Sequence, residues 1–245
     1  MVKNARLVGL VIVLAALPCL ALGMMIPDAK KLPDGDPVQL VGMTVTYVAT
    51  DFFYIEQLDA ISGIRVETTS GFVFRGDMID VMGTIWTNPD KERYITPSGF
   101  YVLGMGPGVR GHYMKNKDVG GGPFGYQLGV YCWQWVYPPG EDPYEDWLPL
   151  AGPNNIGLYV KTAGRVTQVV GGPGPQLIYI DDGSKLEDHL RTTVGVRVEC
   201  DLLPMVMPGD WVLVSGVCSC YLDPDPAVDD PLCRILADSV ELLGF

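Results

Sequence analysis

The sequence repeats one pattern of four short blocks, in the same order, in two parts of the chain. The blocks of the first copy begin at Gly42, Phe53, Gly63 and Gly76, and those of the second begin at Gly164, Ile178, Gly195 and Gly209. Each block is rich in β-branched or aromatic residues, which is typical of β-strands. A pattern that returns in this way indicates that one small structural unit is present twice.

Each copy contains five runs with the composition of strands. We expect strands at 38–48, 52–57, 63–68, 78–86 and 94–103, and again at 157–170, 176–181, 194–200, 211–221 and 233–243. No stretch longer than about ten residues has the 3.6-residue period of an amphipathic helix, so we expect little helix. A glycine in the middle of each long first strand lets that strand bend and join two parts of a sheet. The pattern predicts small closed barrels.

The residues of these strands resemble a known fold family. The first block is Gly42-Met43-Thr44-Val45-Thr46 in one copy and Gly164-Arg165-Val166-Thr167 in the other. Each copy then has Phe/Ile-Tyr-Ile-Glu/Asp, Gly-Ile/Val-Arg-Val and Gly-Asp-x-Val/Ile-x-Val-x-Gly. This pattern is similar to the OB-fold of exported bacterial proteins, whose shape is that of the nucleic-acid-binding helicase and tRNA type. The resemblance implies an all-β chain with two five-stranded OB-like Greek-key barrels in tandem. It implies no particular activity, because OB barrels host unrelated functions.

Residues 1–23 have the pattern of a secretory signal peptide. Lys3 and Arg6 are basic, an apolar run follows, and small residues typical of a cleavage site stand at 21–23. A membrane anchor is the alternative, but the apolar run is shorter than the roughly 20 residues that span a bilayer, and Pro18 interrupts it. We therefore expect a secreted protein, extracellular or in the cell envelope, with no transmembrane segment after cleavage.

The segment between the two barrels is rich in glycine and aromatic residues. The expected parts are a signal peptide at 1–23, a lead-in at 24–37, a first barrel at 38–103, a connecting segment at 104–156 and a second barrel at 157–245. Disordered linkers are poor in aromatic residues. We therefore expect the connecting segment to be ordered and to pack against the barrels or a neighbouring subunit. Its interface candidates are Tyr131, Trp133, Trp135 and Trp147.

The charge of the chain is strongly acidic. Removing Lys3 and Arg6 with the leader leaves 15 Lys and Arg against 29 Asp and Glu, a formal charge of −14. Nucleic-acid-binding proteins usually carry a basic face. The net charge therefore disfavours nucleic acid as a partner.

Five cysteines follow the leader, and an exported location permits disulfides. They are Cys132, Cys200, Cys218, Cys220 and Cys233. Because the number is odd, at least one thiol is free or pairs between chains. We favour a bridge between Cys233 and either Cys218 or Cys220. A metal site at Cys218 and Cys220 is the alternative, but no histidine is near and Zn²⁺ normally takes four N or S ligands.

The sequence contains no recognisable catalytic motif. The two histidines, His112 and His189, cannot supply a three-histidine zinc site, and no Gly-x-Ser-x-Gly nucleophile motif occurs. We therefore predict that the protein is not an enzyme. An extracellular hydrolase that uses two carboxylates is the alternative, and it requires an acidic pair about 5–10 Å apart.

Two acidic loops are candidates for binding Ca²⁺, an ion that takes six to eight oxygen ligands. Asp181 and Asp182 follow one predicted strand, and Asp223 and Asp225 lie in the loop before the last strand. Neither loop has EF-hand spacing, so solvated acidic turns are the favoured interpretation and no cofactor is expected.

The predicted function is binding without catalysis. In OB-folds the face of strands two and three is the usual ligand platform, and the residues predicted there are Phe52, Tyr54, Arg65, Tyr179 and Arg197. We predict an exported binding or structural module whose partner is an envelope polymer, another protein or a second copy of itself. Two linked weak sites would gain avidity. Single-stranded nucleic-acid binding through the barrel faces is an alternative.

Overall fold

The computed structural model describes residues 23–68, 72–171, 176–201 and 204–244. The predicted signal peptide lies outside the described residues, apart from Gly23. Among the helices that are described, none is long and apolar enough to cross a membrane.

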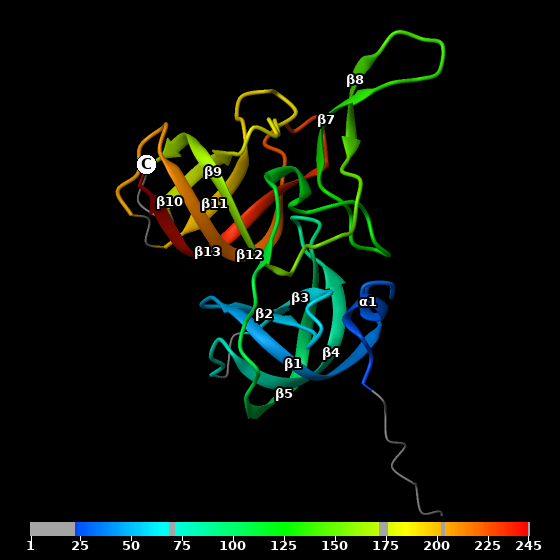
Figure 1. The fold of residues 1–245 in the computed structure, drawn as a ribbon. Helices are drawn as coiled ribbons and strands as arrows, with labels where there is room; N and C mark the ends of the chain where they lie inside the picture. Colours follow the sequence, from blue (N-terminus) through cyan, green and yellow to red (C-terminus); the bar gives the residue numbers. More distant parts are fainter. Residues whose placement is uncertain (1–22, 69–71, 172–175, 202–203, 245) are drawn as a thin grey trace, which may run out of the picture.

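The first half of the chain forms a closed five-stranded barrel (Figure 1). Its strands are β1 (Pro37–Val48), β2 (Phe52–Glu56), β3 (Gly63–Glu67), β4 (Asp77–Thr87) and β5 (Arg93–Met105). They pair in the order β1-β2-β3-β5-β4, with β4 pairing back to β1. Only the β3–β5 pair of this barrel is parallel.

The first strand closes this barrel because it bends. β1 pairs with β4 through its first part and with β2 through its second part. The register of the β1–β4 pair shifts between Leu40 and Met43, where Gly42 has a φ of +69°. Residues with side chains rarely adopt this backbone conformation, so glycine suits the bend.

The second half of the chain repeats the same topology. Its strands are β9 (Tyr159–Val170), β10 (Gln176–Asp181), β11 (Val196–Cys200), β12 (Trp211–Leu222) and β13 (Pro231–Leu243). They follow the order β10-β11-β13-β12-β9, and β9 also pairs with β10, which closes the ring. The prediction of an all-β chain with two five-stranded OB-like barrels is therefore confirmed.

Each barrel has its own apolar interior, built from alternating residues of its strands. The first core includes Leu40, Val45, Phe53, Ile55, Ile64, Val66, Ile79, Val81 and Ile95. The second includes Val160, Val166, Ile178, Ile180, Val196, Val198, Val212, Val214 and Ile235. Because successive side chains of a strand point to opposite faces, the residues between these core positions face outward.

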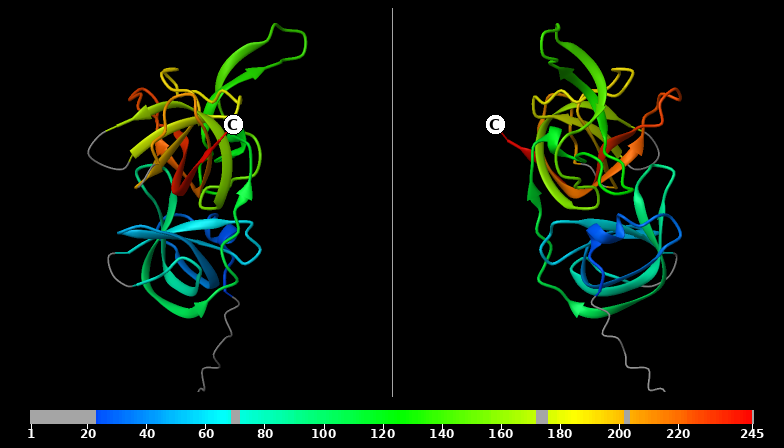
Figure 2. Two further views of the ribbon diagram at one scale, coloured as in Figure 1. Left: turned by 60° about the vertical axis from the view of Figure 1, so that its left-hand side comes forward. Right: turned by 90° about the vertical axis from the view of Figure 1, so that its right-hand side faces the viewer.

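The connecting segment is ordered and adds small elements to the second barrel. β6 (His112–Tyr113) extends its sheet by pairing parallel to β9, and the 3₁₀ helix η1 (Asn116–Asp118) follows. β7 (Tyr131–Val136) and β8 (Tyr144–Pro149) form a hairpin that projects from this barrel (Figures 1 and 2). The short helix α1 (Ile26–Ala29) lies beside the first barrel.

The two barrels are stacked on each other (Figure 2) and meet in an apolar contact with a buried polar network. The apolar part contains Tyr54 of β2, Tyr159 of β9, Val217 of β12 and Leu236 of β13.

The polar part of this junction is centred on Glu92, which is 1% exposed. The hydroxyl of Tyr54 donates to one carboxyl oxygen of Glu92 over 2.7 Å, and the hydroxyl of Ser219 donates to the other over 2.9 Å. Buried polar groups are stable when they are hydrogen-bonded. This network therefore fixes how the barrels sit on each other.

Two glycines allow the barrel backbones to touch at the edge of the junction. A Cβ atom added to Gly63 at the start of β3 would lie 2.1 Å from the carbonyl oxygen of Gly157. A Cβ atom added to Gly157 would lie 2.4 Å from the carbonyl oxygen of Gly63. Both positions therefore require glycine for close approach.

We predict that Gly63→Ala lowers the free energy of unfolding by about 1–3 kcal/mol, the usual cost of forcing extra atoms into a packed contact. Urea unfolding followed by tryptophan fluorescence measures the change. Gly99→Ala is the matched control, because a Cβ atom at Gly99 meets nothing within 4 Å. Equal unfolding curves for the two variants would contradict the close contact between the barrels.

Candidate functional site

The predicted ligand platform of the first barrel lies at the junction. Tyr54 is fully buried, and its hydroxyl contacts Glu92 and Ser219. Burial raises the pKa of Tyr54 well above its usual value. Phe52 packs against the same apolar contact. The second barrel therefore covers this part of the outward face of β2 and β3.

The arginines of the two repeats make the same pair of contacts. Arg65 forms an ion pair with Glu67 at 3.1 Å, and its guanidinium lies 3.8 Å from the ring centroid of Phe52. Arg197 forms an ion pair with Glu199 at 2.8 Å and lies 4.4 Å from the ring centroid of Tyr221. In each case the acid stands two residues further along the same strand, so it shares the arginine's face.

The fifth predicted platform residue, Tyr179, is 7% exposed on β10. It lies opposite Arg197 in the β10–β11 pair. All five platform residues are thus engaged within the chain. Tyr54 is hydrogen-bonded, Arg65 and Arg197 are ion-paired, and Tyr179 is buried. The ring of Phe52 lies against the guanidinium of Arg65.

The aromatic residues of the β7–β8 hairpin divide into a docked group and an exposed one. Trp133 and Trp147 lie 5.6 Å and 5.1 Å from the ring of His189, and Tyr131 stacks on Trp147. The indole N–H of Trp147 donates to Asp230 over 2.7 Å. These three rings contact each other and the loops of the second barrel. Trp135, near the tip, is 58% exposed.

The four aspartates predicted as Ca²⁺ candidates accept hydrogen bonds from nearby groups. Asp181 accepts from the backbone N–H of Lys185, and Asp182 accepts from the backbone N–H groups of Asn116 and Ser184. Asp223 accepts from the backbone N–H groups of His189 and Asp225, and the carboxylate of Asp225 is hydrogen-bonded to the ring of His189. No group of three or more metal-ligating side chains occurs among the described residues. These carboxylates act as turn-stabilising acceptors.

The predicted disulfide is not found. Cys218, Cys220 and Cys233 are buried free thiols, as is Cys132. Cys220 and Cys233 are register partners on β12 and β13, but the thiol of Cys220 contacts the carbonyl oxygen of Asp90 at 3.2 Å. Burial raises the pKa of the Cys233 thiol to about 12. The expectation of a bridge from Cys233 to Cys218 or Cys220 is therefore wrong for this structure.

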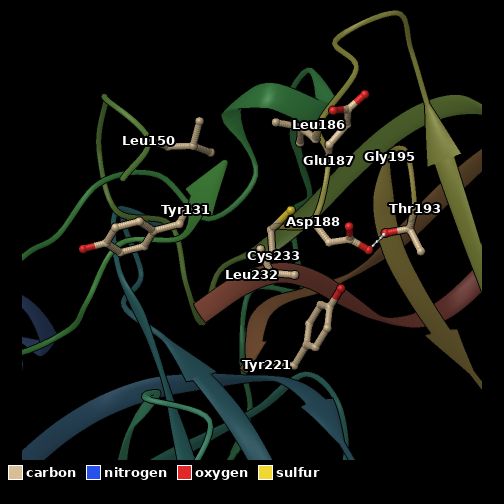
Figure 3. A pocket seen from close by; sticks show the side chains of 10 residues that line it. All are labelled: Tyr131, Leu150, Leu186, Glu187, Asp188, Thr193, Gly195, Tyr221, Leu232 and Cys233. Atoms are coloured by element: carbon tan, nitrogen blue, oxygen red, sulfur yellow. Dashed lines mark hydrogen bonds between the residues drawn. The ribbon is translucent and has the colours of Figure 1, made fainter. Parts of the chain in front are cut away.

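A small cavity lies between the hairpin base and the second barrel (Figure 3). Its lining includes Tyr131, Asp188, Tyr221 and Cys233, and its volume is about 20 Å³. Asp188 accepts a hydrogen bond from Thr193 at its wall. A cavity of this size holds about one water molecule, so it is too small for a ligand.

The positive charges of the protein fall into two groups. Eight arginine and lysine side chains have a carboxylate partner: Lys31, Arg65, Arg75, Lys91, Arg93, Arg191, Arg197 and Arg234. Lys30 is buried and donates to the carbonyl oxygen of Ile156. In the described parts of the chain, the cations with no carboxylate partner are Arg110, Lys115, Lys117, Lys161, Arg165 and Lys185.

These six unpaired cations lie on neighbouring elements, and we call them the basic strip. Arg110, Lys115 and Lys117 flank β6 and η1. β6 pairs with β9, which carries Lys161 and Arg165 four residues apart on its outward face. The loop with Lys185 touches η1, because the backbone N–H of Asp182 donates to Asn116 over 2.8 Å.

An exposed ring lies within the basic strip. Tyr113 is 76% exposed and is the register partner of Lys161, whose ammonium lies 5.7 Å from the ring centroid. Asp118 is an exposed acid at the edge of this surface, and two half-buried acids adjoin it: Asp181, the register partner of Arg165, and Asp182, which accepts from the backbone of Asn116. The strip thus combines concentrated positive charge with an accessible aromatic face.

Reasoning from the sequence missed the basic strip because net charge averages over the whole surface. The local signal was present: residues 110–117 contain Arg110, His112, Lys115 and Lys117 and no acid. This segment alone does not predict the basic strip, because the strip also needs Lys161 and Arg165, which the pairing of β6 with β9 brings to the same surface.

Glu56 is a buried carboxyl at the junction. It is 3% exposed and accepts a hydrogen bond from the backbone N–H of Tyr159. Burial raises its pKa to about 8, while this hydrogen bond and the charge of Arg75 oppose the shift. The folded protein therefore keeps a proton that the unfolded chain has lost between about pH 4.5 and 8.

We predict that the carboxyl of Glu56 makes the protein less stable as the pH rises from about 4.5 to about 8. Glu56→Gln removes this dependence, so its free energy of unfolding should rise relative to that of the unsubstituted protein over this range. Urea unfolding at pH 5, 6.5 and 8 measures the difference. Glu67→Gln, on the more exposed carboxylate beside Arg65, is the control. A difference that does not change with pH would contradict the prediction.

Comparisons with known proteins give matches only among solved structures. No family model matches the chain, and no curated protein matches it. The crystal structure of the S. pombe Stn1-ten1 complex is 18% identical over 36% of this chain and 59% of that chain, with a TM-score of 0.24.

Two further structures are similar over most of the chain. The crystal structure of fission yeast Pot1 and ssDNA is 10% identical over 90% of this chain and 88% of that chain, with a TM-score of 0.34. The crystal structure of the Ifi202 HINa domain in complex with 20bp dsDNA is 10% identical over 86% of this chain and 99% of that chain, with a TM-score of 0.35.

These comparisons correct one expectation. The acidic net charge was expected to disfavour nucleic acid as a partner, yet two of the similar structures are complexes with DNA. Charge interactions at a surface are screened beyond about 8 Å at physiological salt. Local charge therefore matters more than net charge, and the net charge of −12 does not exclude nucleic acid.

Proposed function

We propose that the protein binds single-stranded nucleic acid along the basic strip. The observation that carries this proposal is the convergence of six cations without carboxylate partners on one surface of an otherwise acidic chain. Neutralising phosphates with Lys and Arg releases counterions, which supplies most of the non-specific affinity for nucleic acid. The acidic remainder of the surface confines a phosphate backbone to this strip.

Tyr113 favours a single strand over a duplex. Its ring is 76% exposed beside Lys161, and bases stack on such rings only when they are not already stacked and paired in a duplex. Positive charge that follows the backbone and rings that stack on bases together form the usual single-strand binding surface. The function proposed is thus binding without catalysis, and we also propose an exported protein from the leader at 1–23.

A second candidate function is assembly with another protein or with a second copy of the chain through the β7–β8 hairpin. The observation that favours it is the exposure of Trp135, Tyr137 and Tyr144 on a projecting hairpin. Exposed aromatic patches often mark interaction sites. Light scattering of the protein and of Trp135→Ala over a range of concentrations tests it, and a monomer at every concentration would count against self-assembly.

We predict that Lys117→Gln weakens binding to an oligo-dT of about 12 nucleotides and lowers the slope of log K against log salt by about 0.7, the value for one lost phosphate contact on a single strand. Fluorescence anisotropy between low and moderate salt measures both. Lys31→Gln is the control, because Lys31 is paired with Asp28 away from the strip. No binding by the unsubstituted protein at low salt would refute the proposal.

We predict that Tyr113→Ala lowers affinity for the same oligonucleotide by about 1–3 kcal/mol, the usual contribution of one stacked base. The salt dependence should stay the same, because no phosphate contact is lost. Tyr137→Ala is a closely matched control, since Tyr137 is 74% exposed on the hairpin. Equal losses in the two variants would show that Tyr113 does not stack on a base.

A further inference from the structure

A cleft of about 110 Å³ lies beside Arg110, the first residue of the basic strip along the chain. Its polar side chains are Thr44, Thr46, Glu56, Gln57 and Arg110, and residues 107–109 also line it. Arg110 belongs to the strip, so a bound strand would pass the mouth of the cleft.

Two of these polar groups are fixed by the fold and two are free to bind. Gln57 accepts from the backbone N–H of Ile26 over 2.7 Å, and the hydroxyl of Thr46 donates to the carbonyl oxygen of Tyr54. Glu56 uses one carboxyl oxygen to accept from Tyr159. Its other oxygen and the hydroxyl of Thr44 have no hydrogen-bond partner among the described residues.

The position of Glu56 is unusual for a carboxyl that only stabilises a fold. It is 3% exposed, and the cationic groups near it are Arg75, which also pairs with Asp238 of the second barrel, and Arg110, which lines the cleft. Buried titratable groups in a cleft are typical of binding sites. The cleft therefore combines a buried carboxyl, a buried hydroxyl and an exposed guanidinium.

We propose that this cleft holds the pyrimidine base of one nucleotide, with Glu56 and Thr44 as its hydrogen-bonding partners and Arg110 on the adjoining phosphate. This inference rests on the proposed function of the basic strip. Arginine suits phosphate because its planar group donates several hydrogen bonds. Carboxyl and hydroxyl groups suit the edge of a pyrimidine, which presents both donors and acceptors.

The size of the cleft favours one ring over two. An enclosed cavity of about 150 Å³ holds a benzene molecule. The cleft of about 110 Å³ is smaller than that but partly open, so it admits at most one six-membered ring, part of which stays in solvent. The fused rings of a purine need more room.

The test compares the binding of CMP and UMP with that of AMP and GMP by isothermal titration calorimetry. We expect the pyrimidine nucleotides to bind more tightly by about tenfold. Thr44→Val should reduce this binding about fivefold, the worth of one hydrogen bond. Leu58→Trp should abolish the pyrimidine preference, because Leu58 lines the cleft and is 63% exposed, so a larger ring crowds the opening without disturbing the core.

The control for Leu58→Trp is Leu190→Trp, since Leu190 is 54% exposed and lines no part of the cleft. Equal binding of pyrimidine and purine nucleotides, or an unchanged preference in Leu58→Trp, would overturn the inference. Oligo-dT binding that falls with salt but does not respond to Leu58→Trp would leave the proposed function standing and refute only the cleft. Absence of oligo-dT binding in the unsubstituted protein would refute the proposed function itself.

Discussion

The hydrogen-bonded contact of Tyr54 and Ser219 with the buried carboxyl of Glu92 determines which surfaces of the protein are accessible. It joins β2 of the first barrel to β12 of the second, and the backbones of Gly63 and Gly157 touch beside it. A buried polar network stabilises a protein only when each of its polar groups has a hydrogen-bond partner. Its consequence for function is that the outward face of β2 around Tyr54, where an OB barrel usually holds its ligand, is occupied by the second barrel.

Because that face is covered, the candidate site is an accessible surface elsewhere, on the outside of the second barrel. Most cations elsewhere are held by carboxylates, as Arg234 is by Asp90 and Arg75 is by Asp238. The cations of the basic strip have no such partners and gather around β6 and β9. The function proposed for this surface therefore rests on local charge and on one exposed ring, Tyr113, while the acidic remainder of the chain would repel a phosphate backbone.

The sequence predicted the barrels well because alternation within each strand specifies one buried face. Val45 and Val166, or Ile55 and Ile180, are core residues of matching strands. The sequence could not predict which outward face would be covered, because that depends on contacts between residues far apart, such as Tyr54 and Ser219. The predicted disulfide failed for a similar reason, since the thiol of Cys220 points to Asp90 of the other barrel.

Hydrogen–deuterium exchange of the protein with and without a saturating oligo-dT tests the account most directly. The account predicts slower exchange at 110–117 and along β9, and no change at 52–54 of β2 or in β3, because the second barrel already covers that face around Tyr54. Slower exchange in β2 and β3 with no change at 110–117 would contradict it. That result would show that the barrels separate to bind a strand on the usual OB face.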